Sequence, residues 1–228
     1  MLRFMRIVLR IGGSVVASPI NPQLISEYVA LLKDLKKRGH EVAVVVGGGN
    51  LAREFIKTVK EIGLGEDSQD QVAISVSRVF AQLFMEKLGK LGCGHVPVTV
   101  EETVKCMGEG KIAVMGGLKP GMTTDTVASL IVEKANADVL IKATDQDGIY
   151  DRDPRKHADA VKLDHLSFAD LSRVFAENKH KAGIHQVIDP EAVKILKRRK
   201  VRVIVVNGFK PKNVLAAVEG KAVGTVID

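Results

Sequence analysis

Short, almost wholly apolar runs alternate with amphipathic stretches along the chain, and this alternation restricts the fold more than any other feature. The runs VAVVV (42–46) and VRVIVV (201–206) are apolar at nearly every position, which is typical of strands covered on both faces. A repeated order of strand and then helix predicts an α/β fold. We expect a three-layer αβα sandwich with a central, mostly parallel sheet.

The pattern also predicts where each element lies. Gly39 ends the first long amphipathic stretch, and Asp189-Pro190 is a typical helix start, with an N-cap carboxylate before a first-turn proline. We expect strands at 6–11, 41–46, 95–100, 111–115, 138–143 and 201–206, and helices at 22–38, 51–62, 71–88, 124–136, 190–199 and 211–219.

One stretch interrupts the alternation. Residues 147–166 carry two turn signals, Asp147-Gly148 and Asp153-Pro154, which predict a hairpin or a long excursion over the sheet edge. No linker rich in Pro, Gly or Ser divides the chain. We therefore expect a single domain, 1–228, with a loose division near residue 138.

The net charge is +7, from 34 Lys and Arg against 27 Asp and Glu, yet the chain has no Trp and only two Tyr. A basic excess indicates an anionic partner, and the scarcity of stacking aromatics favours a small phosphate compound over RNA. The basic run 197–200 ends a predicted helix and is most simply a solvated face. We expect no nucleic-acid partner.

The cysteines and the N-terminal segment indicate the cellular compartment that we expect for the protein. Cys93 and Cys106 are the only cysteines and form no C-x-x-C pair, so we expect neither a disulfide framework nor a cysteine zinc site, as in a reducing cytosol. Arginines interrupt the N-terminal apolar stretch, and no apolar run approaches the ~20 residues of a membrane span. We expect a cytoplasmic protein, with translation starting at Met1 or Met5.

Three glycine clusters, at 12–13, 47–49 and 116–117, each follow directly on a predicted strand. The carboxyl edge of a parallel sheet is where ligands bind, and glycine turns let backbone N–H groups approach an anion closely. Neither classical nucleotide motif is complete: no acidic residue follows the second cluster at strand spacing, and Met122 replaces the P-loop lysine. Together the clusters predict one elongated polyphosphate site.

Several polar side chains are candidates for this site. Arg53 and Lys194 each lie one turn into a predicted helix, where a cation could reach a phosphate, although both are otherwise ordinary surface residues. Asp70 could bind ribose hydroxyls or simply cap a helix. Thr123-Thr124-Asp125 suits recognition of a base, although capping alone explains one of the three. The six histidines show no metal-ligand spacing, and we expect no direct protein ligand for a metal.

The segments IVLRIGGSV, VVVGGGNLAREFI, VMGGLKPGMTTDTVA, ATDQDGIYDRDPRK and VIDPEAVKIL, in this order, resemble the amino-acid kinase superfamily and, within it, the archaeal uridylate (UMP) kinases. The resemblance covers essentially the whole chain. It implies transfer of the γ-phosphoryl of Mg-ATP to UMP, with Mg²⁺ as cofactor, ATP and UMP as partners, and a homo-oligomer, usually a hexamer. It also implies that residues 1–137 bind the acceptor and that residues 138–228 bind ATP.

The resemblance assigns roles by position. Asp145 and Lys194 match catalytic residues, and Arg10 stands where many members carry a lysine. The implied ATP-binding residues are Gly13, Ser14, Gly49, Arg53, Thr144, Tyr150 and Asp153. The implied UMP-binding residues are Gly48, Asp70, Leu118, Lys119, Pro120, Gly121, Met122, Thr123 and Thr124.

The chain departs from the family pattern at three places, of which the second and third lie on the ATP side. Arg10 replaces the usual lysine, Asp145-Gln146 replaces the usual Asn-Val, and the stretch Ile184-His185-Gln186 lacks small hydroxyl residues. A kinase of the same superfamily with another acceptor (isopentenyl phosphate, carbamate or an amino acid) remains an alternative, as does a non-catalytic nucleotide- or oxyanion-binding protein. An isopentenyl phosphate kinase would carry histidine by the second glycine cluster, where this chain reads GGGNLAR.

Overall fold

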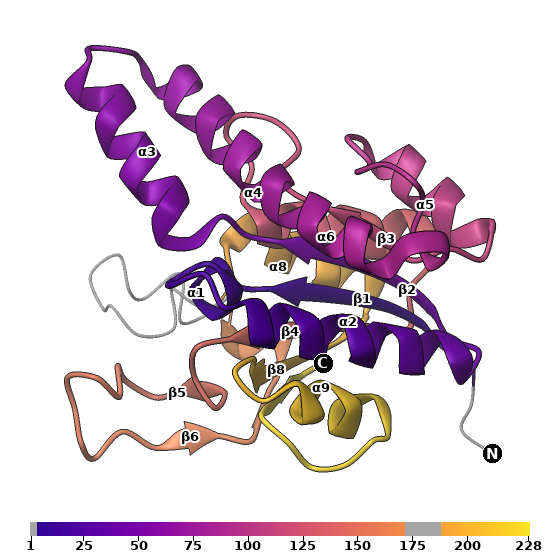
Figure 1. The fold of residues 1–228 in the computed structure, drawn as a ribbon. Coiled ribbons are helices and arrows are strands. Elements are labelled where there is room, and N and C mark those ends of the chain that lie inside the picture. Colours follow the sequence, from indigo (N-terminus) through magenta and orange to yellow (C-terminus); the bar gives the residue numbers. More distant parts are fainter. Residues whose placement is uncertain (1–3, 172–187) are drawn as a thin grey trace.

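The computed structural model describes residues 4–171 and 188–228. A seven-stranded sheet in the order β3-β2-β1-β4-β8-β9-β7 forms its centre, with β9 antiparallel to β8 and the other pairs parallel (Figure 1). The elements are β1 (Arg6–Ile11), α1 (Gly13–Val16), α2 (Pro22–Lys37), β2 (Glu41–Val46), α3 (Gly49–Glu61), α4 (Glu66–Leu88), η1 (Gly89–Leu91), α5 (Val100–Gly108), β3 (Ala113–Met115), α6 (Thr124–Ala135), β4 (Val139–Thr144), β5 (Ile149–Tyr150), β6 (Lys162–Leu163), β7 (His165–Leu166), α8 (Pro190–Arg199), β8 (Arg202–Asn207), α9 (Pro211–Val218) and β9 (Thr225–Ile227).

Both faces of the sheet are covered, which explains why the central strands are apolar at most positions. In β1, Ile7, Leu9 and Ile11 pack with side chains of α2, α4 and α9, whereas Val8 packs with those of α5, α6 and α8. Successive residues of a strand point to opposite faces, so each helix layer receives every second residue. The predicted three-layer fold is confirmed.

The predicted hairpin is also present. The strands β5 and β6 pair antiparallel, with Ile149 opposite Leu163. Figure 1 shows this hairpin projecting from one end of the molecule, while α3 and α4 form a helical pair that projects from another. Within the portion of the chain that the structure describes, no helix is long and apolar enough to cross a membrane.

The strand predicted at 95–100 is wrong, because the chain there leads into helix α5. Thr99 accepts a hydrogen bond from the backbone N–H of Glu102 at 3.1 Å, and the Glu102 carboxylate accepts one from the backbone N–H of Thr99 at 3.3 Å. This capping box satisfies two donors that the first helical turn leaves unpaired. It therefore outweighs the β propensity of the run VPVTV.

The two cysteines form a disulfide between Cys93 and Cys106, which links the start of the segment before α5 to the helix itself. The sequence predicted no disulfide framework, and it did not predict this single pair. The cysteines are 13 residues apart in the sequence. Spacing alone did not reveal that the chain between them turns back on itself to bring their Cα atoms to 5.8 Å.

We expect Thr99→Ala to lower the free energy of unfolding by about 1 kcal/mol, because the variant loses the N-cap acceptor. For a chain of this size that corresponds to a fall in Tm of about 2–4 °C. Thr58→Ala is the matched control, because the Thr58 hydroxyl only donates to Glu54 within α3. An equal Tm for Thr99→Ala and Thr58→Ala, measured by thermal denaturation, would contradict the capping role.

Candidate active site

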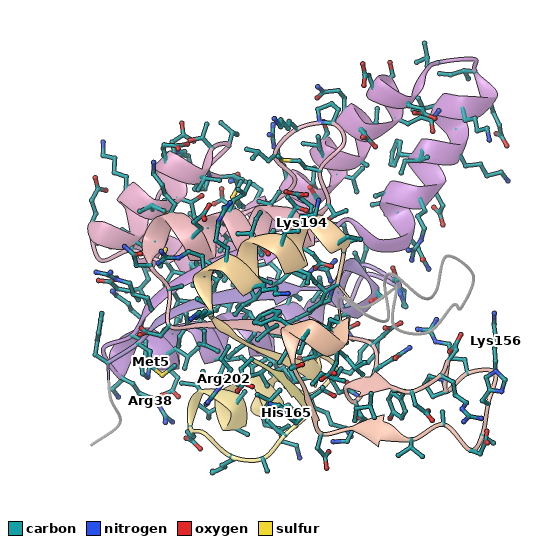
Figure 2. All side chains as sticks on the ribbon, turned by 180° about the vertical axis from the view of Figure 1, so that it is seen from behind. Met5, Arg38, Lys156, His165, Lys194 and Arg202 are labelled. Atoms are coloured by element: carbon teal, nitrogen blue, oxygen red, sulfur yellow. A yellow bond between two sulfur atoms is a disulfide. The ribbon has the colours of Figure 1, made fainter. Side chains whose placement is uncertain are left out.

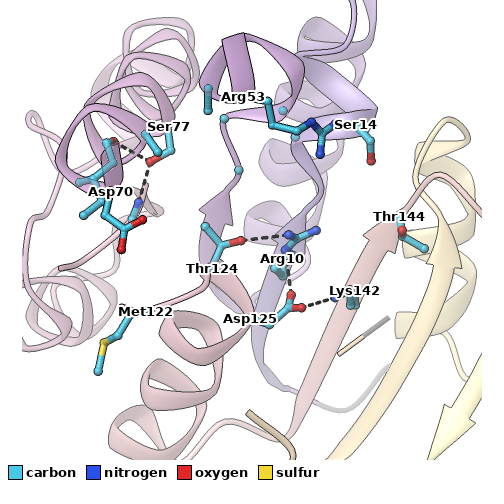
Figure 3. Close-up of a pocket in the computed structure, with 18 of the residues that line it drawn as sticks. Arg10, Ser14, Arg53, Asp70, Ser77, Met122, Thr124, Asp125, Lys142 and Thr144 are labelled. Carbon is cyan, nitrogen blue, oxygen red and sulfur yellow. Dashed lines mark hydrogen bonds and ion pairs between the residues drawn. The ribbon is translucent and has the colours of Figure 1, made fainter. Parts of the chain in front are cut away.

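A cavity of about 600 Å³ opens at the carboxyl ends of β1, β2 and β4 (Figure 3). The glycine turns that follow β1 and β2 form its floor, and α4, the loop before α6 and the end of β4 form its walls. The lining residues are Arg10, Gly13, Ser14, Gly47, Gly48, Gly49, Ala52, Arg53, Asp70, Ala73, Ile74, Ser77, Gly117, Lys119, Met122, Thr124, Asp125, Lys142, Thr144, Asp145 and Arg155.

The first two glycine turns pack backbone against backbone. A Cβ atom on Gly13 would collide with the backbone of Gly49, and Gly49 has a φ of +60°, which side chains rarely adopt. The backbone N–H of Asn50 donates to the Ser18 hydroxyl at 2.6 Å, which ties the two turns together. This close packing exists only because neither turn carries a side chain at the point of contact.

Three buried charges lie beneath these turns. Arg10 on β1 pairs with Asp125 (Nε to Oδ1, 2.9 Å), and the ammonium group of Lys142 on β4 pairs with the other oxygen of the same carboxylate. Arg10 also donates to the hydroxyl of Thr124 at 2.9 Å. Figure 3 shows Asp125 between the two cations. The carboxylate therefore holds a guanidinium and an ammonium group side by side at the cavity.

Burial and mutual attraction set the charges of this cluster. Burial disfavours the cation and lowers the pKa of Lys142 to about 8, an effect that Asp125 opposes and Arg10 reinforces. For Asp125, burial raises the pKa, but Arg10 and Lys142 outweigh it and the net shift is downward. Asp125 is therefore ionised at neutral pH, and Lys142 is a cation that loses its proton in mildly alkaline solution.

The wall formed by α4 carries the predicted ribose-binding residue. Asp70 lies within α4 and lines the cavity, and its Oδ2 accepts a hydrogen bond from the backbone N–H of Gly121 at 2.7 Å. Gly65 is the N-cap of this helix, so the alternative that Asp70 caps it is wrong. The second carboxylate oxygen of Asp70 has no hydrogen bond within the described residues, which leaves an acceptor for hydroxyl groups.

The opposite wall follows the end of β4. Thr144 donates to Asp145 at 3.2 Å, and Asp145 pairs with Arg155 at 2.7 Å. Arg155 belongs to the turn between β5 and β6, and Asp153 holds this turn by accepting from the backbone N–H of Arg155 at 3.0 Å. The projecting hairpin thus contributes a cation to the cavity.

The structure brings most of the predicted site residues together. Those that line the cavity are Arg10, Gly13, Ser14, Gly48, Gly49, Arg53, Asp70, Lys119, Met122, Thr124, Thr144 and Asp145. The predicted residues that do not line it, apart from Lys194, are Leu118, Pro120, Gly121, Thr123, Tyr150 and Asp153. The departure at Ile184-His185-Gln186 falls outside the described residues.

Lys194 is the clear exception. It lies on α8, which covers the face of the sheet opposite α2 and α4 and is turned toward the viewer in Figure 2. Its side chain is 74% exposed and pairs with Glu191 on the same helix at 3.1 Å. The spacing placed it correctly in the first turns of a helix, but its side chain is exposed and does not line the cavity.

Sequence reasoning missed Lys142 and the ionic role of Asp125. The signal for Lys142 was present, because a single lysine in the apolar strand VLIKAT is rarely buried without a partner. Asp125 was grouped with its threonine neighbours as a base-recognition element, whereas Thr123 is the N-cap of α6 and Asp125 pairs with the cations. No group of three or more His, Cys, Asp or Glu side chains in residues 4–171 and 188–228 is placed to hold a metal ion.

Comparison with known proteins agrees with this geometry. Residues 5–207 match the Amino acid kinase family over most of the chain. The chain belongs to the amino acid kinase family. Among curated members, it is 42% identical to a uridylate kinase of Methanocaldococcus jannaschii, over 98% of this chain and 100% of that protein. It is 36% identical to a uridylate kinase of Methanobrevibacter smithii, over 98% and 99% of the two chains.

Solved structures of other family members have the same fold. The crystal structure of uridylate kinase from Archaeoglobus fulgidus superposes with a TM-score of 0.88 at 38% identity, covering 98% of this chain and 100% of that one. A UMP kinase structure from Bacillus anthracis gives a TM-score of 0.83 at 21% identity, covering 99% and 97%, which supports the fold alone. The three-layer arrangement around the glycine turns is thus shared within the family.

The pKa of Lys142 predicts how the stability of this amino acid kinase family member depends on pH. Above about pH 8 the folded protein loses the Lys142 proton, whereas the unfolded chain keeps it up to about the ordinary value of 10.5. The unfolded state binds more protons in this window, so this group makes the free energy of unfolding rise with pH between them. Below pH 8 the folded protein carries Lys142 as a buried cation, and the free energy of unfolding is reduced by the full cost of burying that charge.

Urea unfolding of the wild type and of Lys142→Met at several pH values would measure this contribution. We expect the difference in unfolding free energy between the two proteins to change across pH 8–10.5 in favour of the wild type. A difference that stays constant across this window would show that Lys142 titrates at its ordinary pKa.

Proposed function

We propose that this member of the amino acid kinase family is a uridylate kinase, which transfers the γ-phosphoryl group of ATP to UMP and releases UDP and ADP. The observation that carries the proposal is the cation pair, Arg10 and Lys142, held by one buried carboxylate beneath two abutting glycine turns. In this proposal each of the two glycine turns binds a phosphate, and the contact between the turns places the donor and acceptor phosphates next to each other. The names of the similar proteins support UMP as the acceptor.

The two substrates would approach from opposite walls. On the acceptor side, within residues 1–137, Asp70 offers a free carboxylate oxygen to ribose, and the loop 118–124 surrounds the base. On the donor side, residues 138–228 contribute Thr144, Asp145 and the hairpin with Tyr150 and Asp153, while Gly13, Ser14, Gly49 and Arg53 contact the triphosphate. Gly48 would bind the UMP phosphate. Each residue of this assignment comes from the family resemblance, and the positions of Asp70 and Thr144 on opposite walls are consistent with it.

Phosphoryl transfer requires positioning and cationic stabilisation more than a strong base, because the charge of the loose transition state spreads over the phosphoryl oxygens. A UMP phosphate oxygen is already a competent nucleophile near neutral pH. In this proposal Arg10 and Lys142 contact the transferring group, and Asp125 orients both. The phosphate contact that sequence reasoning gave to Lys194 therefore passes to Lys142.

Mg²⁺ would accompany ATP as cofactor. Magnesium binds proteins through one or two carboxylates together with substrate phosphates, and Asp145 supplies a carboxylate at the cavity, which fits this donor set. When bound, the ion neutralises charge on the phosphate oxygens. Asp145 would hold it, and Arg155 would fix the orientation of that carboxylate through their ion pair.

The same resemblance leads us to propose a cytoplasmic homo-oligomer, of hexameric size. Exposed apolar side chains on the projecting helices, Phe55 and Ile62 near α3 and Val79 and Leu83 on α4, favour burial against another copy. Sedimentation of the purified protein would measure the size directly.

A coupled assay of ADP release with a panel of acceptors tests the proposed activity. We expect UMP to be the preferred acceptor over CMP, dTMP and isopentenyl phosphate. Preference for isopentenyl phosphate would support a kinase with another acceptor. Nucleotide binding without ADP release from any acceptor would support a non-catalytic binding protein, and either result would overturn the proposal.

Matched lysine variants test the mechanism. Lys142→Met removes a buried cation beside the transferring group, and we expect kcat to fall by about 100-fold or more, as for loss of one oriented donor to a transition state. Lys194→Ala removes an exposed lysine, and we expect kcat to stay within about twofold, as for surface changes away from a site. The reverse order of these two effects would return the catalytic role to Lys194.

A further inference from the structure

The loop between β3 and α6, residues 116–123, separates two cavities. Lys119 and Met122 line the active-site cavity on one side, and they also line a second, mostly apolar cavity of about 440 Å³ on the other. Leu118 lies on the side of the second cavity. Leu118 and Met122 pack partly against the core below. The loop also has open space on both sides, and directed hydrogen bonds supply its remaining contacts with the rest of the molecule.

Those hydrogen bonds come from helix α4. The buried Ser77 hydroxyl accepts from the backbone N–H of Gly117 at 2.7 Å and donates to the carbonyl of Ile74 at 2.7 Å (Figure 3). The Arg78 guanidinium donates through Nε to the carbonyl of Gly117 and through Nη2 to that of Leu118, each at 3.2 Å. Asp70 completes the set by accepting from Gly121.

In residues 4–171 and 188–228, every hydrogen bond between a side chain and the backbone of this loop comes from these three residues of α4. Asp70 and Ser77 are seven residues apart, so they lie on nearly the same face of the helix. The glycines permit the close approach: a Cβ on Gly116 would lie 2.6 Å from the Ser77 hydroxyl and 2.7 Å from the backbone N–H of Arg78.

We propose that Arg78, supported by Ser77, is a positioning residue that sets the acceptor affinity of the site by holding the loop 116–123 over it. Arg78 itself does not line the active-site cavity, so it acts through the loop and not by contact with substrate. Its planar fork bridges two successive carbonyls, which a lysine, with a point charge, does not reproduce. The proposal rests on the proposed function, in which this loop surrounds the acceptor.

Steady-state kinetics with each substrate varied separately tests this role. For Arg78→Ala we expect the KM for UMP to rise about tenfold, the loss expected when a charged donor to backbone carbonyls is removed. The KM for ATP and kcat should stay within about twofold of the wild type, because Arg10, Lys142 and the donor wall are unchanged. Arg78→Lys should retain one of the two contacts and give an intermediate KM for UMP.

Two further variants keep the test decisive. Ser77 itself lines the cavity, but its hydroxyl is engaged with Gly117 and Ile74. Ser77→Ala therefore removes the acceptor of the Gly117 N–H and should raise the KM for UMP selectively, even if Arg78→Ala folds poorly. Lys87→Ala, an exposed cation in the last turn of the same helix, is the matched control and should leave both KM values unchanged. Equal rises in both KM values, or a fall in kcat alone, would indicate a merely structural role and overturn the proposal, as would unchanged kinetics in Arg78→Ala and Ser77→Ala.

This result is distinguishable from failure of the proposed function. If the wild type prefers another phosphorylated acceptor to UMP, the assignment of UMP fails while the selective change in acceptor KM can still be measured with that acceptor. If the wild type phosphorylates UMP and the Arg78 and Ser77 variants behave as wild type, the positioning role fails and the proposed function stands.

Discussion

The site depends on one buried carboxylate. Asp125 lies at the start of α6, and its two oxygens hold Arg10 of β1 and Lys142 of β4, neighbouring strands at the centre of the sheet. Removing either cation from water costs several kcal/mol, and pairing with a shared, ionised partner offsets that cost. The same contacts bring the start of α6, and therefore the loop before it, to the carboxyl edge of the sheet. The ion pairs that assemble the site are therefore also contacts that hold the start of α6 against β1 and β4.

The regions of the molecule that follow local rules could be predicted from the sequence. The strands β1, β2, β4 and β8 are mostly apolar on both faces, and the helices α2 and α8 have clear start and stop signals. Their positions are confirmed within one or two residues. The glycine turns were predicted to meet at one edge of the sheet, and the structure confirms that the first two pack together. Parallel strands all end at the same edge of the sheet, and the alternation of strands and helices along the sequence already indicates a parallel sheet.

The regions that depend on contacts between distant residues could not be predicted. The apolar strand around Lys142 indicated that this lysine needs a partner, but the sequence alone did not show that the partner is Asp125. Whether Lys142 or Lys194 reaches the cavity depends on which face of its strand or helix turns inward. Cys93 precedes α5 and Cys106 lies within it, so their pairing depends on a turn and a helix where the sequence predicted a strand. The role of Arg78 is set by a loop about 40 residues later in the chain.

The charge of the cavity explains why the cluster is built with one arginine and one lysine. Among the residues that the structure describes, five cations and three carboxylates line the cavity, whereas a phosphate monoester alone brings about −1.5 to −2 charges at neutral pH and a triphosphate brings more. Bound nucleotides would therefore carry more negative charge than the protein offsets, which favours a divalent cation and favours the protonated form of Lys142. Arg10 keeps its charge at every physiological pH, whereas the pKa of Lys142, lowered by burial to about 8 in the protein alone, would rise as phosphates approach. Lys142, already mostly protonated at neutral pH, would thus keep its charge into more alkaline solution when phosphates are bound, whereas Arg10 anchors Asp125 regardless of them.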